Sequence, residues 1–355
     1  MSKVYFLNNV YPTEECPQMG SYAKTMADDL SAAGHDVTVD AVFYHKSSVG
    51  AKDKAAAYAA FWPRLLRVNL SDYDIVYINH FTYCFPVLFN PTLKKSGKVY
   101  IHWHGKELVA SSAFNRRLVK LLGKRLAGMR HIAPSLFFKK KILAAVPVET
   151  DSVAVSPSGG IDTGLFCPSD TESGADCLVI GFPGEIKTTK GADVLLEIMG
   201  MHEEIRRATG RAPLFRFISY GPELEAYIPR FKSTGARFEV LPKIPKNEMP
   251  GFFRPLDIAL VLSSAVIGES LGLVALEAMS CGVPVIAHDI CAFPEFILSG
   301  VSGELTPYSD SPQTRAREVF DKIVIVASRR DSYSPRKVVE SDYSRESVID
   351  FYKTL

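Results

Sequence analysis

The sequence predicts an α/β protein with two doubly wound, parallel-sheet domains that face a cleft. Three observations lead to this prediction. A chain of 355 residues is too long for one ordinary core, and short apolar runs alternate with helical patterns along it. At 155–174 the composition shifts to Ser, Gly, Pro and Asp, which indicates a linker, and the alternation then starts again. Strand–helix–strand succession at this spacing favours parallel sheets, and ligands of such folds usually bind in a cleft beside them.

The first half contains runs of β-branched and aromatic residues that predict strands. These runs lie at 3–8, 35–43, 74–79 and 98–103. Helices are expected at 21–34, where Gly34 provides a stop signal, and near 114–128. We assign residues 1–157 to the first domain and residues 158–174 to the linker.

The second half repeats this organisation in a domain that we assign to residues 175–335. Strands are expected at 177–182, 214–220, 238–242, 257–263 and 283–287. The remaining residues, 336–355, include apolar positions at helical spacing near the end of the chain. This terminal helix could complete the second domain, or it could cross back and pack on the first.

The composition restricts the classes of function. Hydrophobic residues make up 47% and charged residues 23% of the chain, and the net charge of +2 argues against a globally basic nucleic-acid binder. The six cysteines show neither a CxxC pair nor metal-ligand spacing, so reduced thiols in a cytosolic protein are expected. We find neither a signal peptide nor an apolar run of roughly 18 residues. A cytoplasmic location is therefore expected.

The segment GESLGLVALEAMSCGVPVIA, residues 268–287, places one glutamate before a predicted helix and another inside it. Ser270 is a good N-cap, and Gly282, followed by a proline, ends the helix. Glu269 then lies in the loop above the helix. Glu277 returns to almost the same face about 10 Å along the helix axis.

The first backbone amides of this predicted helix belong to Leu271, Gly272 and Leu273 and would form an anion site. Gly272 would let a phosphate approach the backbone closely. This arrangement suits a sugar nucleotide with its diphosphate at the helix end. Glu269 would accept hydrogen bonds from the sugar hydroxyls and Glu277 from the ribose hydroxyls. The alternative is an amphipathic helix with two solvated glutamates.

The chain resembles the family 4 glycosyltransferases, which have two glutamates separated by seven residues in this context. Other segments resemble the family over nearly the whole chain. They are PQMGSYAKTMADDLSAAGHDVTV, VSPSGGIDTGLFCP, FPGEIKTTKGADVLLEIM, SYGPE and CAFPEFILSGVSGEL. The resemblance implies the GT-B fold of two Rossmann-like domains, an acceptor-binding first domain and a second domain that binds a UDP- or GDP-linked sugar. It also implies retention of anomeric configuration and no divalent metal or other cofactor.

The phosphate loop of the family, G-R-x-x-x-x-K-G, corresponds to residues 184–191. By this resemblance Gly184 and Lys190 contact the donor diphosphate, but Glu185 replaces the usual arginine. A glutamate facing the diphosphate would oppose Lys190, because unit charges about 4 Å apart interact by roughly 4 kcal/mol at an effective dielectric near 20. We hypothesise that Glu185 points away and that Lys187 supplies the second cation. The alternative is a surface Lys–Glu pair.

A histidine follows one of the predicted strands of the first domain. His104 lies at a strand end, where ligands bind in doubly wound sheets, and resembles the histidine of the family that contacts the donor sugar. We predict a catalytic role for it together with Glu269 and Lys190. His102 is expected to point to the other face and to be structural. His80, at another strand end, could help to form the acceptor pocket.

Three further positions complete the predicted site. Gly20 resembles one of two adjacent glycines that lie near the donor phosphate in the family. Glu295 resembles a glutamate for which we infer a role in ordering the loop near the donor. The segment 72–74, Asp-Tyr-Asp, mimics a metal-binding DxD motif, but it precedes a strand, so we interpret it as a turn and predict no metal site.

The segment 116–141 is strongly basic and contains no acidic residue. Its nine cations are Lys or Arg at 116, 117, 120, 124, 125, 130, 139, 140 and 141. Leu and Phe are interleaved with them, and a second apolar and basic stretch lies at 58–68. Such a pattern suits the surface of an anionic membrane, and the alternative is a solvated helix face with its apolar side in the core. Nucleic acid is a poor alternative, because stacking aromatics are not arranged along a groove.

Together these features predict a retaining, metal-independent glycosyltransferase. It would move a sugar from a nucleotide diphosphate to a saccharide hydroxyl, on a lipid-linked intermediate at the inner face of the membrane. Two alternatives stay open. One is a nucleotide-sugar-binding protein that has lost transferase activity, motivated by Glu185 and the missing glycine beside Gly20. The other is a sugar-nucleotide epimerase on the same fold.

Overall fold

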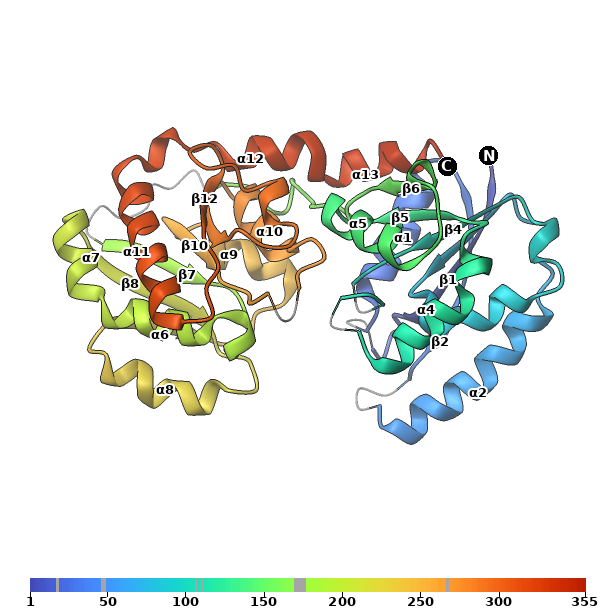
Figure 1. Cartoon of the computed structure of the whole chain (residues 1–355), viewed down its shortest axis with the longest axis horizontal. Helices are drawn as coiled ribbons and strands as arrows, with labels where there is room; N and C mark the ends of the chain where they lie inside the picture. The colour runs from blue at the N-terminus through green and yellow to red at the C-terminus, as the bar shows by residue number, and fades with distance from the viewer. Residues whose placement is uncertain (17–18, 46–48, 106, 110, 169–176, 266–267) are drawn as a thin grey trace. The chain divides into compact units, whose positions relative to one another are not determined.

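The computed structural model describes all residues except 17–18, 46–48, 106, 110, 169–176 and 266–267. The chain divides into two compact units (Figure 1). Unit 1 comprises Met1–Gly160 and Arg345–Leu355, and unit 2 comprises Ile161–Ser344. Each unit is built on a six-stranded sheet whose neighbouring strands are all parallel. The predicted α/β class with two parallel-sheet domains is confirmed. Residues 169–174 of the predicted linker lie outside the described residues.

The sheet of unit 1 has the order β2-β1-β3-β4-β5-β6. Its strands are β1 (Lys3–Tyr11), β2 (Asp36–Phe43), β3 (Ile75–Asn79), β4 (Lys98–His102), β5 (Arg130–Ala133) and β6 (Val153–Val155). Successive side chains of β1 enter opposite faces, as the two-residue period of a strand requires. Tyr5 and Leu7 join one buried cluster, whereas Val4 and Phe6 join another. Both faces of this sheet are therefore buried.

Helices cover both faces of the sheet of unit 1. They are α1 (Ser21–Ala32), α2 (Ala51–Arg67), α3 (Phe81–Cys84), α4 (Ala113–Leu126), α5 (Leu136–Ala145) and α13 (Arg345–Tyr352). Buried side chains of α2, α4 and α5 pack in the first cluster, and those of α1 and α13 pack in the second. Ser112 caps α4 by accepting a hydrogen bond from the Asn115 amide, 3.1 Å away.

The last helix, α13, belongs to unit 1 although the segment before it belongs to unit 2 (Figure 1). Tyr352 is fully buried, and its hydroxyl lies 3.4 Å from the Tyr77 hydroxyl of β3. Its main-chain oxygen accepts a hydrogen bond from the His35 ring at 2.8 Å. Arg345, at the start of α13, pairs with the buried carboxylate of Asp29 in α1. The sequence left open whether this helix completes the second domain or packs on the first. In the structure it packs on the first.

The sheet of unit 2 has the order β12-β11-β10-β7-β8-β9. Its strands are β7 (Cys177–Phe182), β8 (Ala212–Ile218), β9 (Arg237–Leu241), β10 (Ile258–Val261), β11 (Val285–His288) and β12 (Gly303–Thr306). Counted within the unit, this is the strand order of the dinucleotide-binding folds. The sheet reverses direction of winding between β7 and β10, and ligands of such sheets bind outside the carboxyl ends of the strands at this point.

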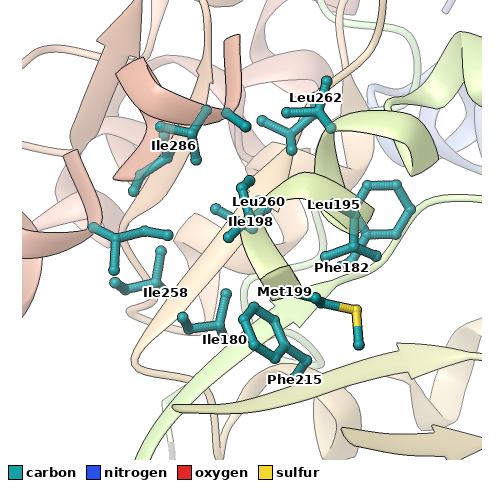
Figure 2. Close-up of a cluster of buried hydrophobic side chains, with 14 of the residues drawn as sticks. Ile180, Phe182, Leu195, Ile198, Met199, Phe215, Ile258, Leu260, Leu262 and Ile286 are labelled. Carbon is teal, nitrogen blue, oxygen red and sulfur yellow. The ribbon is translucent and has the colours of Figure 1, made fainter. Parts of the chain in front are cut away.

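The helices of unit 2 follow its strands. They are α6 (Ala192–Gly200), α7 (His202–Thr209), α8 (Leu224–Ser233), α9 (Met249–Phe253), α10 (Leu273–Ser280), α11 (Pro312–Ser328) and α12 (Pro335–Val338). Figure 2 shows the core between α6 and the sheet, where Leu195, Ile198 and Met199 meet Ile180 and Leu260. A near-continuous apolar core of this kind fixes the ends of β7 and β10, from which the loops of the candidate site extend.

Candidate functional site

The predicted phosphate loop follows β7 at the point where the sheet of unit 2 reverses its winding. A short 3₁₀ helix, Thr188–Lys190, leads into α6, and Gly191 caps this helix in the left-handed conformation with φ +92°. The neighbouring turn holds the loop from one side. Ile186 N–H donates to the Tyr220 carbonyl at 2.9 Å, and the amide and hydroxyl of Thr188 donate to Glu223 at 2.9 and 2.6 Å.

Two glycines allow these loops to approach each other so closely. A Cβ on Gly191 would lie 2.4 Å from the Leu262 carbonyl oxygen, just after β10. A Cβ on Gly221, whose φ is +128°, would lie 2.5 Å from the backbone N and O of Ile186. Both positions therefore require glycine on two grounds, because the backbone conformation and the lack of space each exclude a side chain.

Lys190 and Glu269, predicted as partners of the donor, form an ion pair with each other. The Ser263 hydroxyl donates to the same carboxylate oxygen at 2.8 Å. The exposed fractions of the Lys190 and Glu269 side chains are 28% and 20%, so the pair is partly desolvated but reachable from solvent. Ser263 follows β10 and Lys190 follows β7, so the pair lies at the reversal point of the sheet. A diphosphate that binds Lys190 must compete with this carboxylate or share the lysine with it.

The helix that follows Glu269 begins later than predicted. Ser270 is not its N-cap: α10 starts at Leu273, and Gly272 occupies the cap position with φ +92°. The Leu271 side chain is buried at 2% exposure, and this burial holds the residue in the loop. A Cβ on Gly272 would lie 2.7 Å from the Phe293 ring, so the segment after β11 packs against the start of the helix. The amides at the helix start are thus those of Gly272, Leu273 and Val274, and the Leu271 amide lies outside this set.

Glu277 is buried inside α10, so the alternative of a solvated side chain is wrong for this glutamate. Its carboxylate lies 3.6 Å from Nζ of Lys246. Burial raises the pKa of Glu277, and Lys246 opposes this effect. Burial raises the pKa of the Tyr220 hydroxyl. The charges of Glu185 and, to a smaller extent, Glu277 raise this pKa further. No local sequence signal identifies Lys246, which lies 31 positions away from its partner Glu277.

The remaining predicted residues of unit 2 take up distinct positions. Gly184 lies after β7, beside Lys190. A Cβ built on Gly184 would lie 3.9 Å from the Cβ of Lys190. Glu295 ends a short 3₁₀ helix, Phe293–Glu295, and is half-buried. Burial raises the pKa of Tyr343 to about 12, with a smaller contribution from the Glu295 charge. Glu295 therefore lies near Tyr343, in the segment whose Phe293 ring contacts Gly272 at the start of α10.

Lys187, predicted as a second cation for the donor, is half-buried at the start of the loop, and its charge acts on Glu223. The Thr188 hydrogen bonds, and to a smaller extent Lys187, lower the pKa of Glu223. We expect Lys187→Ala to weaken binding of a nucleoside diphosphate about tenfold, because a second cation near the loop is lost. Calorimetric titration measures this, with the exposed Lys232→Ala in α8 as the control. Unchanged affinity and turnover in Lys187→Ala would show that this lysine does not contact the donor.

In unit 1, three histidines stack at the carboxyl ends of β3 and β4. The His104 ring lies 4.3 Å from the His80 ring and 4.6 Å from the His102 ring, between centroids, and both pairs are stacked. The prediction that His102 points to the other face is wrong, because residues two apart on a strand share a face. His102 is nevertheless fully buried, as expected of a structural residue, and its ring contacts the Tyr77 hydroxyl at 2.6 Å.

His104 is held as a neutral imidazole. Burial and the neighbouring rings of His80 and His102 place its pKa well below the usual range. Nε2 lies 2.9 Å from Oδ1 of Asn79, and since this oxygen only accepts, Nε2 carries the proton and donates. A neutral, oriented imidazole can recognise a hydroxyl without adding charge to the site.

Glu107 is a residue that the sequence analysis missed. It is completely buried, and its carboxylate accepts hydrogen bonds from the amides of His104 at 3.3 Å and Gly105 at 3.0 Å. Its other oxygen lies 3.4 Å from Nδ1 of His80, which has the uncommon backbone conformation φ 45°, ψ 55°. One buried carboxylate thus holds the His104 turn by hydrogen bonds and lies beside His80. An acid three residues after His104 was the only available signal.

Gly20 caps α1 with φ +81°, and a Cβ there would lie 2.8 Å from the Val10 carbonyl oxygen. The loop after β1 and the start of α1 therefore lie in close contact beside the histidine stack, where Tyr22 packs edge-on against His80 and His104. The PQMG segment of the family resemblance includes residues 17–18, which lie outside the described residues.

Within the part of the chain that the structure describes, no helix is both long and apolar enough to cross a membrane.

The chain matches a known protein family over part of its length. Residues 177–321 match the family described as "Glycosyl transferases group 1". The chain is 27% identical over 164 residues to the D-inositol 3-phosphate glycosyltransferase of Mycobacterium marinum, a match that covers 44% of this chain and 34% of the relative. It is 30% identical over 198 residues to that of Stackebrandtia nassauensis, covering 51% and 43%. The chain thus spans less than half the length of these curated relatives. The matches confirm the predicted resemblance to this group of transferases.

Solved structures match the whole fold. Sucrose-phosphate synthase from Thermosynechococcus elongatus is similar with a TM-score of 0.76 and 13% identity, covering 100% of this chain and 98% of that protein. HepE from Anabaena in complex with UDP and glucose is similar with a TM-score of 0.70 and 15% identity, covering 99% and 98%. These similarities confirm the predicted GT-B fold. They do not distinguish family 4 from other groups, so that assignment stays a prediction.

Proposed function

We propose that this chain, whose residues 177–321 match the group 1 glycosyl transferases on a GT-B fold, is a retaining glycosyltransferase that uses a nucleotide-diphosphate sugar. The observation that supports this most directly is the Lys190–Glu269 pair at the reversal point of the sheet of unit 2. One cation and one carboxylate in contact can divide the recognition of such a donor. The lysine would bind the diphosphate and the carboxylate the sugar hydroxyls.

In this proposal the chemistry is electrostatic. The bond between the anomeric carbon and the diphosphate oxygen breaks, and negative charge develops on the leaving diphosphate. Lys190 and the amides at the start of α10 stabilise this charge, and they are in place before the reaction. The departing phosphate oxygen takes the proton of the acceptor hydroxyl, whose oxygen forms the new glycosidic bond on the same face. These groups supply the positive charge, so the proposal includes no divalent metal.

The contribution of unit 1 is proposed on the family resemblance. His104 would contact the donor sugar, and His80 would help to form the acceptor pocket. The neutral state of His104 and its fixed hydrogen bond to Asn79 support recognition of an uncharged hydroxyl. Glu107 would keep both histidines in position through the turns that it holds.

The experiment that tests the function begins with a panel of UDP- and GDP-linked sugars and the purified protein. A donor that binds only the folded state raises the melting temperature. The stabilising donor is then incubated with and without saccharide acceptors, and products are analysed for linkage and anomeric configuration. Transfer with retention supports the proposal. Binding without transfer or hydrolysis favours a binding protein, and a new nucleotide sugar formed without acceptor favours an epimerase.

A lipid-linked acceptor and peripheral attachment to the membrane are part of the proposal, and the exposed face of α4 supports them. Leu118 and Leu122 of α4 are buried in the core, as the solvated-helix alternative expected. Leu121 and Phe114, however, are 78% and 59% exposed, beside cations of the 116–141 segment. Exposed apolar groups among cations suit an anionic bilayer surface. We therefore propose an intermediate of cell-surface polysaccharide or glycolipid synthesis as the acceptor, on the inner face of the membrane.

We expect Leu121→Ser to reduce the affinity of the protein for vesicles of phosphatidylcholine and phosphatidylglycerol, 3:1, measured by sedimentation, by about tenfold or more, since a buried leucine side chain contributes roughly 1.5–3 kcal/mol. Leu298, also exposed but in unit 2, provides a matched control as Leu298→Ser. Equal loss in both variants, or none in either, would contradict membrane attachment through α4.

A further inference from the structure

A second candidate site lies at the other end of the sheet of unit 1, away from the histidine stack. A cavity of about 950 Å³ opens at the amino ends of β4 and β5. Its walls come from residues 88–99, the last turn of α4 and the turn before β5. The whole cavity belongs to unit 1. Its volume lies at the upper end of the range for small-molecule sites.

The described residues that line this cavity include five cations and no acidic residue. The cations are Lys94, Lys98, Lys124, Arg125 and Arg130. Among the described residues, no ion pair joins Lys94, Lys124, Arg125 or Arg130 to a carboxylate, although lysines and arginines elsewhere in the chain form many such pairs. Like charges around one concave surface repel each other, and the low-dielectric walls concentrate their field. This cluster is therefore a strong attractor for an anion.

Both arginines of the cavity are held in place. The Arg125 guanidinium lies over the Phe89 ring at 4.5 Å and donates to the Leu88 carbonyl at 3.2 Å. Arg130 donates to the Tyr100 hydroxyl at 3.3 Å and lies 5.8 Å from the centre of that ring. A guanidinium that is already oriented loses little freedom on binding, and its planar fork matches the oxygens of a phosphate.

A purely structural role accounts for only part of this charge. Lys124 and Arg125 lie in the last turn of α4, where cations stabilise the carboxyl end of a helix. Lys98 contacts the main-chain oxygen of Leu355, so its charge already has one partner at the cavity. Neither explanation applies to Lys94 or to Arg130, which starts β5. Three cations from two other segments thus converge on the two at the end of α4.

We propose that this cavity binds a phosphate-bearing anion with at least two negative charges. The ligand class follows from five converging cations, of which two are oriented guanidinium groups. The apolar lining residues Leu88, Leu93 and Met129 leave room for a carbon skeleton beside the phosphate. The source is either a free polyphosphate or a phosphorylated lipid headgroup. This inference does not depend on the proposed transferase function. The cavity lies at the amino ends of the strands, whereas the histidine stack lies at their carboxyl ends.

The test uses the full chain and inorganic pyrophosphate as the soluble probe. Because pyrophosphate could also bind at Lys190, titrations are made in a Lys190→Ala protein. We expect pyrophosphate still to bind the Lys190→Ala protein. Its affinity should fall at least tenfold when Arg125→Ala and Arg130→Ala are added. The matched control adds Arg117→Ala and Lys120→Ala instead, which removes the same charge from exposed positions of α4 outside the cavity. Its affinity should stay within twofold.

Vesicles distinguish the two sources. Phosphatidylcholine vesicles with 10% phosphatidylinositol 4-phosphate are compared with vesicles of equal charge density made with phosphatidylglycerol. A preference for the phosphoinositide that only the Arg125/Arg130 variant loses supports a headgroup, whereas tight pyrophosphate binding without this preference supports a free anion. The proposal is overturned if neither probe binds, or if both pairs of substitutions weaken binding equally. Tighter binding of a single-stranded oligonucleotide than of pyrophosphate or the vesicles would also overturn the proposal. Unchanged melting temperatures show that each variant is folded.

Discussion

Lys190→Ala is expected to lower kcat/KM for glycosyl transfer by a factor of about 100 to 1,000, the usual cost of removing one preorganised group that stabilises developing charge. The lysine lies at the reversal point of the sheet of unit 2 and is partly desolvated, so its charge is not fully screened by water. Steady-state kinetics with the stabilising donor measures the effect. A decrease of less than fivefold would exclude the role assigned to this lysine.

Glu269→Ala separates the two halves of the proposed recognition. The Glu269 carboxylate contacts Lys190 in the structure, so its removal leaves the lysine free for a diphosphate. We expect the variant to lose most transfer activity, yet to bind the nucleoside diphosphate product at least as tightly as the unmodified protein. A double-mutant cycle with Lys190→Ala gives the coupling between them. Additive effects on kcat/KM would show that the two residues act independently and would argue against a shared site.

Gly191→Ala is expected to shift the urea midpoint of unit 2 strongly and to abolish donor binding. A left-handed conformation costs a residue with a Cβ about 1–2 kcal/mol, and overpacking adds typically 1–3 kcal/mol. Both penalties apply here, because φ is +92° and the new Cβ would lie 2.4 Å from the Leu262 carbonyl oxygen. Relief of this contact would displace Lys190, the preceding residue.

Gly210 provides the matched control for Gly191→Ala. It also has a positive φ, +72°, and caps a helix, but nothing lies within 4 Å of a Cβ built there. Gly210→Ala should show the conformational penalty alone and bind the donor normally. The prediction fails if both variants unfold at the same urea concentration, since close packing at Gly191 would then contribute nothing.

Much of the fold was predictable because strands of parallel sheets have apolar runs that local composition reveals. The three strands that were missed, β5, β6 and β12, contain three or four residues each and lack the longer apolar run that surrounds the equally short β10. The start of α10 was misplaced because Ser270 satisfies the local rule for a cap, whereas burial of Leu271 and the conformation of Gly272 decide the true start. Such tertiary effects leave no local signal.

The candidate site shows the same difference between features with a local sequence signal and features that depend on tertiary contacts. The resemblance supplied Lys190 and Glu269 separately, but their ion pair joins residues 79 positions apart and depends on strand order. The orientation of His102 required only the two-residue period of a strand and was nevertheless misjudged. Glu107 and Lys246 could not be found, because a single acid or lysine in a polar loop resembles many others.

The return of α13 to unit 1 has a consequence for the order of folding during synthesis. Residues of unit 2 are complete at Ser344, whereas unit 1 still lacks Tyr352, which fills a space against β3 beside Tyr77. Unit 1 therefore cannot be completed until unit 2 has been synthesised. Until residues 345–355 emerge, the part of this sheet face that α13 covers beside α1 stays exposed and available to chaperones.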